Sequence, residues 1–318
     1  MKRNKWIINI AKIIVVALLV WAIINQIFLV DDFLNTWNLF KSSISGNVIW
    51  ISVCVILLMM INWAFEAKKW QVLVNKIETI KFSESYKAIF CGVAFAMITP
   101  NRIGEYAGRI FYTRKAGVIK TIAVTMIGSF SQVITTTFFG LVGLMFYIII
   151  YAGQSSYVNA IIYFSALSTI GILFLMFFNL QKIYSSIQDI KYLKKIKTYL
   201  LIISQYSGKE FIKVLAFSVL RYITFTIQYL LLLNLFGVHE TYFHMTIMIT
   251  LIFLVQTIIP SFAIAEIGIR GNVALFFLGM VSENHLGIWS AASCLWLVNL
   301  VLPSIIGSFY FLKINSNK

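Results

Sequence analysis

The stretch that decides the fold is Ala96-Met-Ile-Thr-Pro-Asn-Arg-Ile-Gly-Glu-Tyr-Ala-Gly-Arg109. It places a proline, a carboxylate and two guanidinium groups inside a chain that otherwise consists of apolar runs. Pro100 interrupts a helix that begins before it, and Asn101 directly after it is a good N-cap for a second helix. Glu105 and Arg109 are four residues apart, which places the two side chains on one helix face as an ion pair. The stretch therefore predicts two short helices joined by a break.

A second stretch repeats this pattern and reads Thr257-Ile-Ile-Pro-Ser-Phe-Ala-Ile-Ala-Glu-Ile-Gly-Ile-Arg270. Pro260 is again followed by a capping residue, Ser261. Glu266 again precedes Arg270 by four residues, as in an ion pair on one helix face. We expect the second stretch to break a helix in the same way.

The composition excludes a soluble globular protein. Of the 318 residues, 60% are hydrophobic and only 12% are charged, and the mean hydropathy is +0.88. The net charge of +15 would favour nucleic acid in a soluble protein. Here, however, lysines and arginines cluster in short loops beside apolar runs, which is the positive-inside pattern of membrane proteins. We expect an all-helical integral membrane protein, a single polytopic domain over residues 1–318, and no nucleic-acid partner.

Apolar runs that are long enough to cross a bilayer recur along the chain. The basic residues between them place the loop at about 181–210, and both termini, on the cytoplasmic side. The second run stops before Glu66, which we expect to form a solvated pair with Lys68 and Lys69 at the membrane interface. The six expected full spans are about 13–30, 48–65, 118–150, 158–180, 211–236 and 286–312.

The two broken segments are expected to be re-entrant helical hairpins. If residues 85–99 crossed the membrane, Arg102 and the basic residues after it would lie outside. Hairpin one, at about 83–116, is expected to enter from the cytoplasm, and hairpin two, at about 242–281, from outside. Such an inverted repeat places a substrate site where the broken helices meet. The expected break or hinge positions are Pro100, Gly104, Pro260 and Gly268.

Charged side chains inside apolar segments cost about 2.5–3.5 kcal/mol each at a helix centre, and they usually mark function. Arg102, Arg109 and Arg270 carry the planar donors that bind phosphate. Alternatively, each Glu-x-x-x-Arg pair neutralises itself and only pins its hairpin. Arg221, inside the fifth span, either contacts a phosphate or pairs with the glutamate of one hairpin. The candidate substrate-binding residues are Arg102, Glu105, Arg109, Arg221, Glu266 and Arg270.

No motif for catalysis or cofactor binding is visible in the sequence. The chain lacks the P-loop pattern, and it has no H-E-x-x-H or G-x-S-x-G motif. Its three histidines and three cysteines lack the spacing of metal ligands. We therefore assign no catalytic residue, expect no cofactor and no metal ion, and favour transport over catalysis.

The two stretches resemble the hallmark segments of the lysylphosphatidylglycerol synthase transmembrane, or flippase-like, family. The resemblance is carried by Thr99-Pro-Asn-Arg-Ile-Gly-Glu105 with Arg109, and by Ile259-Pro-Ser-Phe-Ala-Ile-Ala-Glu-Ile-Gly-Ile-Arg270, and it extends from the first span to the last. It implies a domain that moves anionic or aminoacylated lipids between leaflets. Two features differ from the family pattern. Ser261-Phe-Ala-Ile-Ala265 replaces a glycine-rich segment, and the sequence has no soluble aminoacyl-transfer region, so lysyl transfer is not expected.

Together these features predict a flippase-like transporter in the cell membrane that translocates an anionic or phosphate-linked lipid. Its partners would be membrane lipids with phosphate headgroups, and both a homo-oligomer and a partner from envelope biosynthesis are left open. Two other functions also remain open. One is a membrane-embedded helper subunit. The other is a lipid-modifying enzyme of a cell-envelope lipid or glycan pathway that uses Glu105 as a base.

Overall fold

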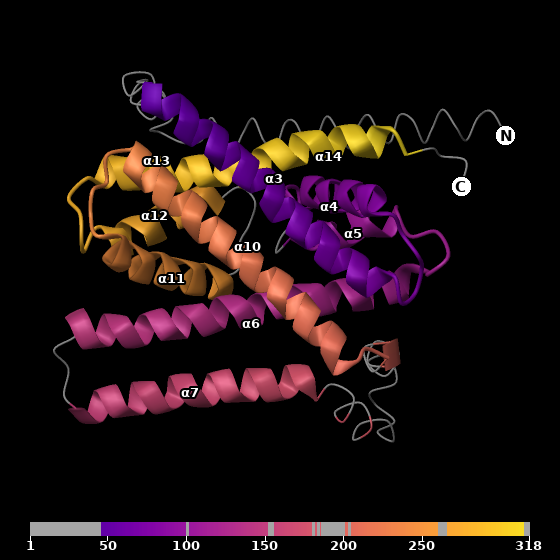
Figure 1. The fold of residues 1–318 in the computed structure, drawn as a ribbon, viewed down its shortest axis with the longest axis horizontal. Coiled ribbons are helices and arrows are strands. Elements are labelled where there is room, and N and C mark those ends of the chain that lie inside the picture. Colours follow the sequence, from indigo (N-terminus) through magenta and orange to yellow (C-terminus); the bar gives the residue numbers. More distant parts are fainter. Residues whose placement is uncertain are drawn as a thin grey trace.

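The computed structural model is a bundle of long helices (Figure 1). It describes residues 46–99, 102–151, 156–179, 205–259 and 266–314, together with Lys182, Ser185, Leu201 and Ile202. This described part is all-helical and contains no strand, which confirms the expected fold class. The expected first span at 13–30 and most of the basic loop at 181–210 lie outside the described residues.

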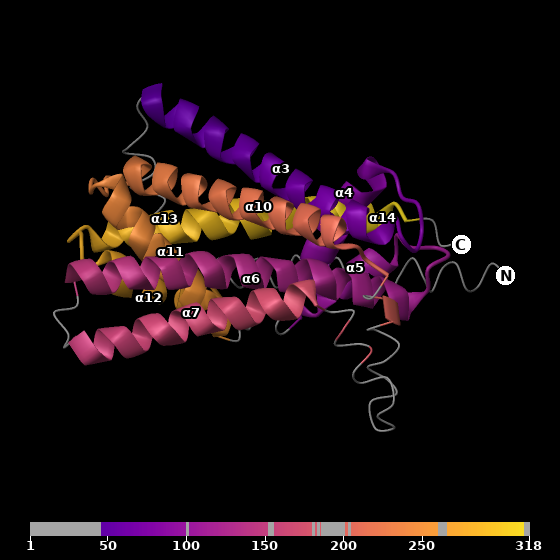
Figure 2. The ribbon, with the colours of Figure 1, turned by 60° about the horizontal axis from the view of Figure 1, so that its bottom comes forward.

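Five helical segments within the described ranges are long and apolar enough to cross a membrane. The protein is therefore a multi-pass membrane protein. In Figure 2 these segments extend along the length of the bundle. They are α3 (Gly46–Val74), α6 (Val118–Tyr151), α7 (Ser156–Phe178), α10 (Gly208–Leu235) and a last segment made of α13 (His285–Trp296), the π-helical turn η4 (Leu297–Val301) and α14 (Leu302–Leu312).

The ends of these helices match the expected spans except at α3. The second span was expected to stop at Phe65, but α3 continues to Val74. The reason is that Glu66 and Lys69 are buried on the inner face of α3, where they pair, so their charges do not end the helix.

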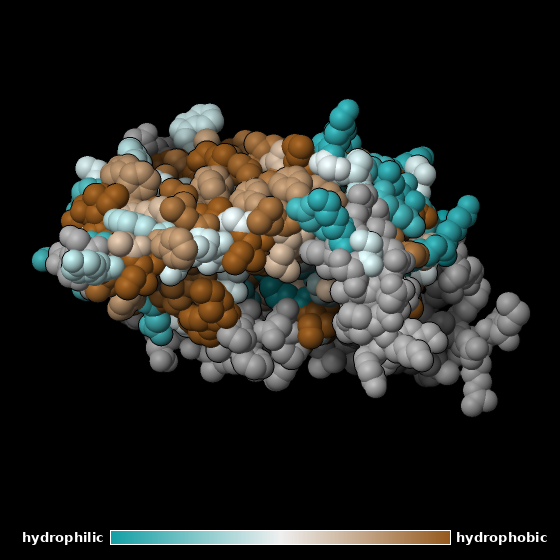
Figure 3. Space-filling model, turned by 90° about the horizontal axis from the view of Figure 1, so that it is seen from below, coloured by the Kyte–Doolittle hydropathy of each residue, from teal (hydrophilic) through white to brown (hydrophobic). Residues whose placement is uncertain are grey.

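The outer surface of the bundle suits a lipid environment. The face shown in Figure 3 is largely apolar, and hydrophilic side chains gather toward one end. On α7, large apolar side chains such as Phe164, Leu167 and Leu175 are exposed. Neighbouring exposed apolar side chains of this kind would promote association in water, whereas in a bilayer they face hydrocarbon.

Each broken segment forms a pair of helices that pack against each other. Hairpin one consists of α4 (Phe82–Ala96) and α5 (Gly104–Ile110), and hairpin two of α11 (Tyr242–Ile258) and α12 (Glu266–Leu278). The two pairs lie toward opposite ends of the bundle (Figure 1). Pro100 and Pro260 lie outside the described residues. That the hairpins enter a membrane from opposite sides stays a prediction.

Hairpin one is packed backbone to backbone. A Cβ atom added to Gly108 of α5 would lie 2.3 Å from the backbone nitrogen of Gly92 on α4. Contact this close between two helices requires glycine on both, as at many helix interfaces within membranes. The short helix α5 is thereby held against α4 although only a few residues form it.

The last membrane segment supports hairpin one from the other side. A Cβ atom on Gly307 of α14 would lie 1.9 Å from the carbonyl oxygen of Phe90 on α4. Upstream of this contact, η4 carries Asn299, whose Nδ2 donates to the carbonyl of Leu295 at 3.2 Å. Asn299 also accepts a hydrogen bond of 3.3 Å from Nδ2 of Asn62 on α3. Short π-helical turns inside longer helices are frequent at functional sites.

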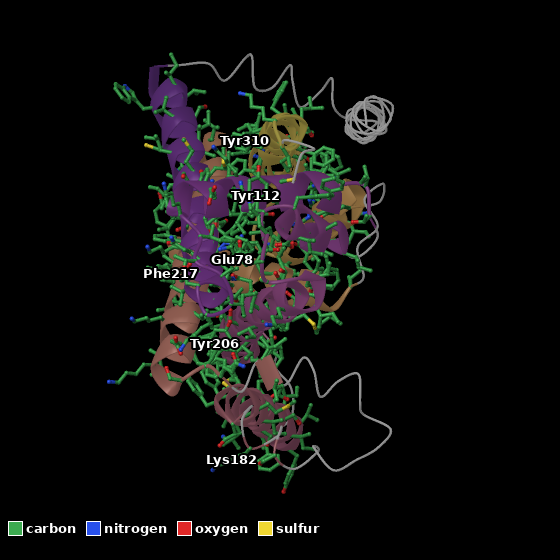
Figure 4. The ribbon with its side chains drawn as sticks, turned by 90° about the vertical axis from the view of Figure 1, so that its right-hand side faces the viewer. Glu78, Tyr112, Lys182, Tyr206, Phe217 and Tyr310 are labelled. Atoms are coloured by element: carbon green, nitrogen blue, oxygen red, sulfur yellow. The ribbon has the colours of Figure 1, made fainter. Side chains whose placement is uncertain are left out.

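The two ends of hairpin one are tied together outside the spans by Glu78, which is labelled in Figure 4. Its Oε2 accepts backbone hydrogen bonds from Arg114, Lys115 and Ala116 at 2.9, 2.7 and 3.0 Å. Partial burial raises the pKa of Glu78, but these three N–H groups and the charge of Lys115 outweigh it, so the pKa lies below its usual value. The carboxylate joins the loop before α4 to the loop after α5.

Candidate functional site

Glu66, on the buried face of α3, shares its carboxylate among three cations. Lys69 Nζ lies 2.7 Å from Oε2, Arg109 Nη2 lies 3.0 Å from Oε1, and Arg221 Nη1 also contacts Oε2. All four residues are at most 9% exposed. The expected solvated pair at the membrane interface is therefore wrong, because only Lys68 stays at the surface while Glu66 and Lys69 face the interior.

Polar side chains from neighbouring helices give Arg221 and Lys69 further hydrogen bonds. Arg221 Nε donates to Oδ1 of Asn62 at 3.1 Å, and Lys69 Nζ donates to Oγ of Ser218 at 3.4 Å. Gln132 of α6 accepts from Nη1 of Arg221 at 3.5 Å. Buried charges are tolerated only when they are paired in this way. The cluster thus joins α3, α5, α6 and α10 around one carboxylate.

Arg109 uses only one of its three guanidinium nitrogens. Its Nη2 donates both to Glu66 Oε1, at 3.0 Å, and to Glu105 Oε1, which confirms the predicted pair on α5. Nε and Nη1 of Arg109 are buried and have no hydrogen-bond partner in the described part of the chain. Buried polar groups nearly always have partners, so each exception calls for an explanation. An anion beside Arg109 would supply the missing acceptors.

A second charged cluster is built by hairpin two. Nη2 and Nε of Arg270 donate to Oε1 of Glu266 at 2.7 and 3.1 Å, which confirms the predicted pair. Nη1 of Arg270 donates to Oε1 of Gln256 on α11 at 3.2 Å, so the arginine links the two helices of the hairpin. The hinge expected at Gly268 is wrong, because α12 begins at Glu266 and runs through this glycine.

Arg102 belongs to the segment that joins the two helices of hairpin one. It lies two residues before α5, it is partly buried, and its φ of 57° is in the left-handed region that non-glycine residues rarely adopt. Gly104, an expected break position, is the first residue of α5, and its N–H donates to Thr99 Oγ1 at 2.7 Å. The end of α4 and the start of α12 share one core cluster, which contains Met97 and Ile267.

Five of the six candidate binding residues lie in these two clusters, which we call together the charged region, and Arg102 lies two residues before α5. One partner differs from the expectation, because Arg221 pairs with Glu66 rather than with Glu105 or Glu266. Sequence reasoning missed the centre of the region, where Glu66, Lys69, Asn62 and Gln132 are buried or hydrogen-bonded to the cations. The sequence did contain a sign of this buried polar face, since the polar residues 62, 66 and 69 recur on one helix face within an apolar run.

The donor set of the charged region suits an anion rather than a metal ion. Guanidinium and ammonium groups only donate hydrogen bonds and repel cations, and each of the three carboxylates is already engaged by arginine or lysine. Within the ranges that the structure describes, no group of three His, Cys, Asp or Glu side chains could hold a metal ion.

Comparison with known protein families gives one match. The model of the family described as lysylphosphatidylglycerol synthase TM region matches residues 9–307, which is nearly the whole chain. The chain belongs to this family. The match to the lysylphosphatidylglycerol synthase TM region includes both hairpins and every residue of the charged region, and it confirms the resemblance of the two proline-containing stretches. No curated protein and no solved structure matched the chain.

Proposed function

We propose that this member of the lysylphosphatidylglycerol synthase TM family is flippase-like and moves an anionic or phosphate-linked lipid between the leaflets of its membrane. The observation that carries the proposal is the excess of positive charge around the buried carboxylate of Glu66 on α3. Lys69, Arg109 and Arg221 surround one fully buried carboxylate, and Arg109 keeps two nitrogens without acceptors. A site of this kind is costly to bury unless an anion completes it. The family membership supports a lipid as the source of that anion.

The geometry also supports a route for a headgroup. Glu105 and Arg270 keep 20% and 27% of their side chains exposed, so the charged region reaches the surface of the bundle while Arg109 lies behind it. Figure 3 shows hydrophilic atoms recessed within an otherwise apolar face. A phosphate group would enter between the hairpins while its acyl or prenyl chains remain beside the apolar outer helices. Alternate opening of the region toward the two leaflets would then move the headgroup across.

A transport assay in proteoliposomes tests this proposal. Purified protein is reconstituted with fluorescent phosphatidylglycerol or a fluorescent polyprenyl-phosphate analogue, and leaflet exchange is measured for wild type, Arg109→Ala and Arg270→Ala. We expect wild type to move at least one of these lipids and both variants to lose that movement. Lys68→Ala is the matched control, because it removes an exposed cation one residue from Lys69 and should leave transport unchanged.

Two results would overturn the proposal. One is that wild type moves neither lipid. The other is that the lipid is recovered in a chemically altered form, which indicates an enzyme. Monodisperse elution of each variant from a size-exclusion column separates loss of function from loss of folding.

A further inference from the structure

We propose that Asn62 and Asn299 are positioning residues for Arg221, and that Arg221 held in this way presents a free guanidinium nitrogen to the headgroup of the transported lipid. This inference rests on the proposed function, and it deepens that function by bringing the last membrane segment into the binding site. It begins from the donors of Arg221. A guanidinium group has five N–H donors, and Nε and Nη1 of Arg221 donate to Asn62, Glu66 and Gln132.

The guanidinium group of Arg221 is held in one orientation by these bonds and by two aromatic rings. Its Cζ lies over the ring of Trp63, 5.0 Å from the ring centroid, and 5.9 Å from the centroid of Phe225. Nη2 donates to no group in the described part of the chain, and 11% of the side chain is exposed. Two nitrogens of Arg221 therefore fix its position, and the third is left for a ligand.

Asn62 accepts from Nε of Arg221, and this contact fixes the direction of its amide. Oδ1 must face Arg221, because a guanidinium group offers only donors. Nδ2 of Asn62 then needs an acceptor elsewhere, since this residue is fully buried. Oδ1 of Asn299 is that acceptor at 3.3 Å, and Nδ2 of Asn299 donates in turn to the carbonyl of Leu295 at 3.2 Å. The contacts thus select one of the two amide orientations at each asparagine.

Asn299 brings the last membrane segment into this arrangement. It lies in η4, and among the described residues its side chain is linked to Arg221 through Asn62. Without the oxygen of Asn299, Nδ2 of Asn62 becomes a buried donor that lacks an acceptor, which is unfavourable. Rotation of the Asn62 amide relieves this cost, but it takes Oδ1 away from Nε of Arg221. Asn299 therefore sets the orientation of Arg221 across the interface between η4 and α3.

The free nitrogen of Arg221 belongs to the same cluster as the unpaired nitrogens of Arg109. Both arginines contact the carboxylate of Glu66, Arg221 at Oε2 and Arg109 at Oε1. Nε and Nη1 of Arg109 are buried and have no partner among the described residues. Guanidinium groups bind phosphate oxygens strongly when their planar donors are correctly oriented. An anionic headgroup beside Glu66 would accept from both arginines, so its affinity should depend on the orientation of Arg221.

The test measures the affinity for the lipid separately from the maximum rate. Proteoliposomes contain a rising mole fraction of fluorescent phosphatidylglycerol or of a fluorescent polyprenyl-phosphate analogue, whichever wild type moves. Leaflet exchange is measured for wild type, Asn62→Leu, Asn299→Leu and the double variant. Leucine is close to asparagine in size and adds no polar group. We expect Asn299→Leu to raise the half-saturating mole fraction about fivefold, as for the loss of one hydrogen bond, and to keep the maximum rate within about twofold of wild type.

The double variant separates positioning from a merely structural role. Because Asn299 acts through Asn62, adding Asn299→Leu to Asn62→Leu should not raise the half-saturating mole fraction further. Asn299→Gln keeps an amide and should lie closer to wild type than Asn299→Leu. The control is Ser304→Ala, which removes a buried hydroxyl of the same segment that donates to the carbonyl of Val301, and it should behave as wild type. If Asn299→Leu does not fold, Asn299→Ser replaces it, because its hydroxyl is too short to reach Asn62.

The outcomes separate this inference from the proposed function. Exchange of no lipid by wild type overturns both, and uptake of radiolabelled inorganic phosphate in its place shows that the site serves a free anion. An unchanged half-saturating mole fraction in Asn299→Leu, or a change of the maximum rate alone, overturns the positioning role while lipid movement stands. The same holds if Asn299→Leu has its full effect in the Asn62→Leu background. A fivefold effect that disappears in that background supports the inference.

Discussion

Glu66→Gln is the substitution that most directly tests the organisation of the interior. Glutamine keeps the size of the side chain and one carbonyl acceptor, but it removes the negative charge and replaces the second acceptor oxygen with an NH2 donor. In the native protein that charge faces Lys69, Arg109 and Arg221. The substitution leaves these three cations with only Glu105, which is partly exposed, as a carboxylate partner within their cluster.

The expected magnitude follows from burial and from the number of partners. Removing one member of a buried ion pair usually costs about 3–5 kcal/mol, because the remaining charge stays buried without compensation. Glu66 is 3% exposed and serves three cations, so we expect the upper part of that range, about 4–5 kcal/mol. Since folded proteins are stable by only about 5–15 kcal/mol, a loss of this size should be easy to measure.

The measurement is unfolding in mixed micelles with a rising fraction of SDS, followed by tryptophan fluorescence. Trp63 and Trp70 lie on α3 on either side of Glu66 and are buried, so they report on this region. Glu283→Gln is the control, because it makes the same chemical change at an exposed position. The double variant Glu66→Gln with Lys69→Met should recover part of the loss, with a coupling of about 1–3 kcal/mol.

One result would refute this reasoning. If Glu66→Gln unfolds at the same SDS fraction as wild type and Glu283→Gln, the shared carboxylate does not hold the bundle together. A double-mutant cycle completed with Lys69→Met that gives no coupling energy would show that Lys69 and Glu66 do not interact in the folded protein.

Three further predictions concern hairpin one and its surroundings. Gly108→Ala should destabilise the protein by about 1–3 kcal/mol because its methyl group overlaps the backbone of α4. The control is Gly171→Ala on α7, where an added Cβ meets no atom within 4 Å. Equal stability of the two variants would contradict the close packing of α5 on α4. The pKa of Glu78 is lowered in the folded state, so its stabilisation is complete above the usual glutamate pKa of about 4.3 and is lost as pH falls below that value through the lower folded-state pKa. The stability difference between wild type and Glu78→Gln should therefore shrink toward acid, and a constant difference would count against the backbone contacts. Tyr206→Phe removes a hydrogen bond of 2.6 Å to the carbonyl of Leu73 and should cost about 1 kcal/mol in thermal unfolding, whereas Tyr157→Phe, which is exposed, should be neutral.

The ends of most membrane helices could be predicted from the sequence, but the end of α3 could not. Hydropathy detects the long apolar runs of α6, α7 and α10, and charged residues mark the end of α7 and the start of α10, while the uncharged polar segment Gln154-Ser-Ser156 separates α6 from α7. In α3 the same rule fails, because Glu66 and Lys69 resemble an exit from the membrane. Two of the three cations that bind Glu66 come from residues 43 and 155 positions away in the chain. A rule that counts charges without their partners therefore ends the helix too early.

The charged region was predictable where its contacts are local. The two Glu-x-x-x-Arg pairs follow from helical spacing alone, and the structure contains both. The partner of Arg221 depends on how distant helices pack, which no local pattern contains. The repeated hairpin pattern indicated that charged residues from the two breaks would meet. It gave no information that a carboxylate on α3 would lie among them.

The π-helical turn η4 has a consequence for the alignment of the last helix. A π-turn holds one residue more than an α-helix of the same length, so everything after η4 is rotated by about 100° and shifted by about 1.5 Å relative to an uninterrupted helix. Deleting one residue between Leu297 and Val301 would restore regular winding and leave Gly307 beside the carbonyl of Phe90, whereas regular winding of all these residues would turn Gly307 away from it. A larger residue of α14 would then face α4. The extra residue in η4 thus acts as a phase shift that sets which side of the last helix meets hairpin one.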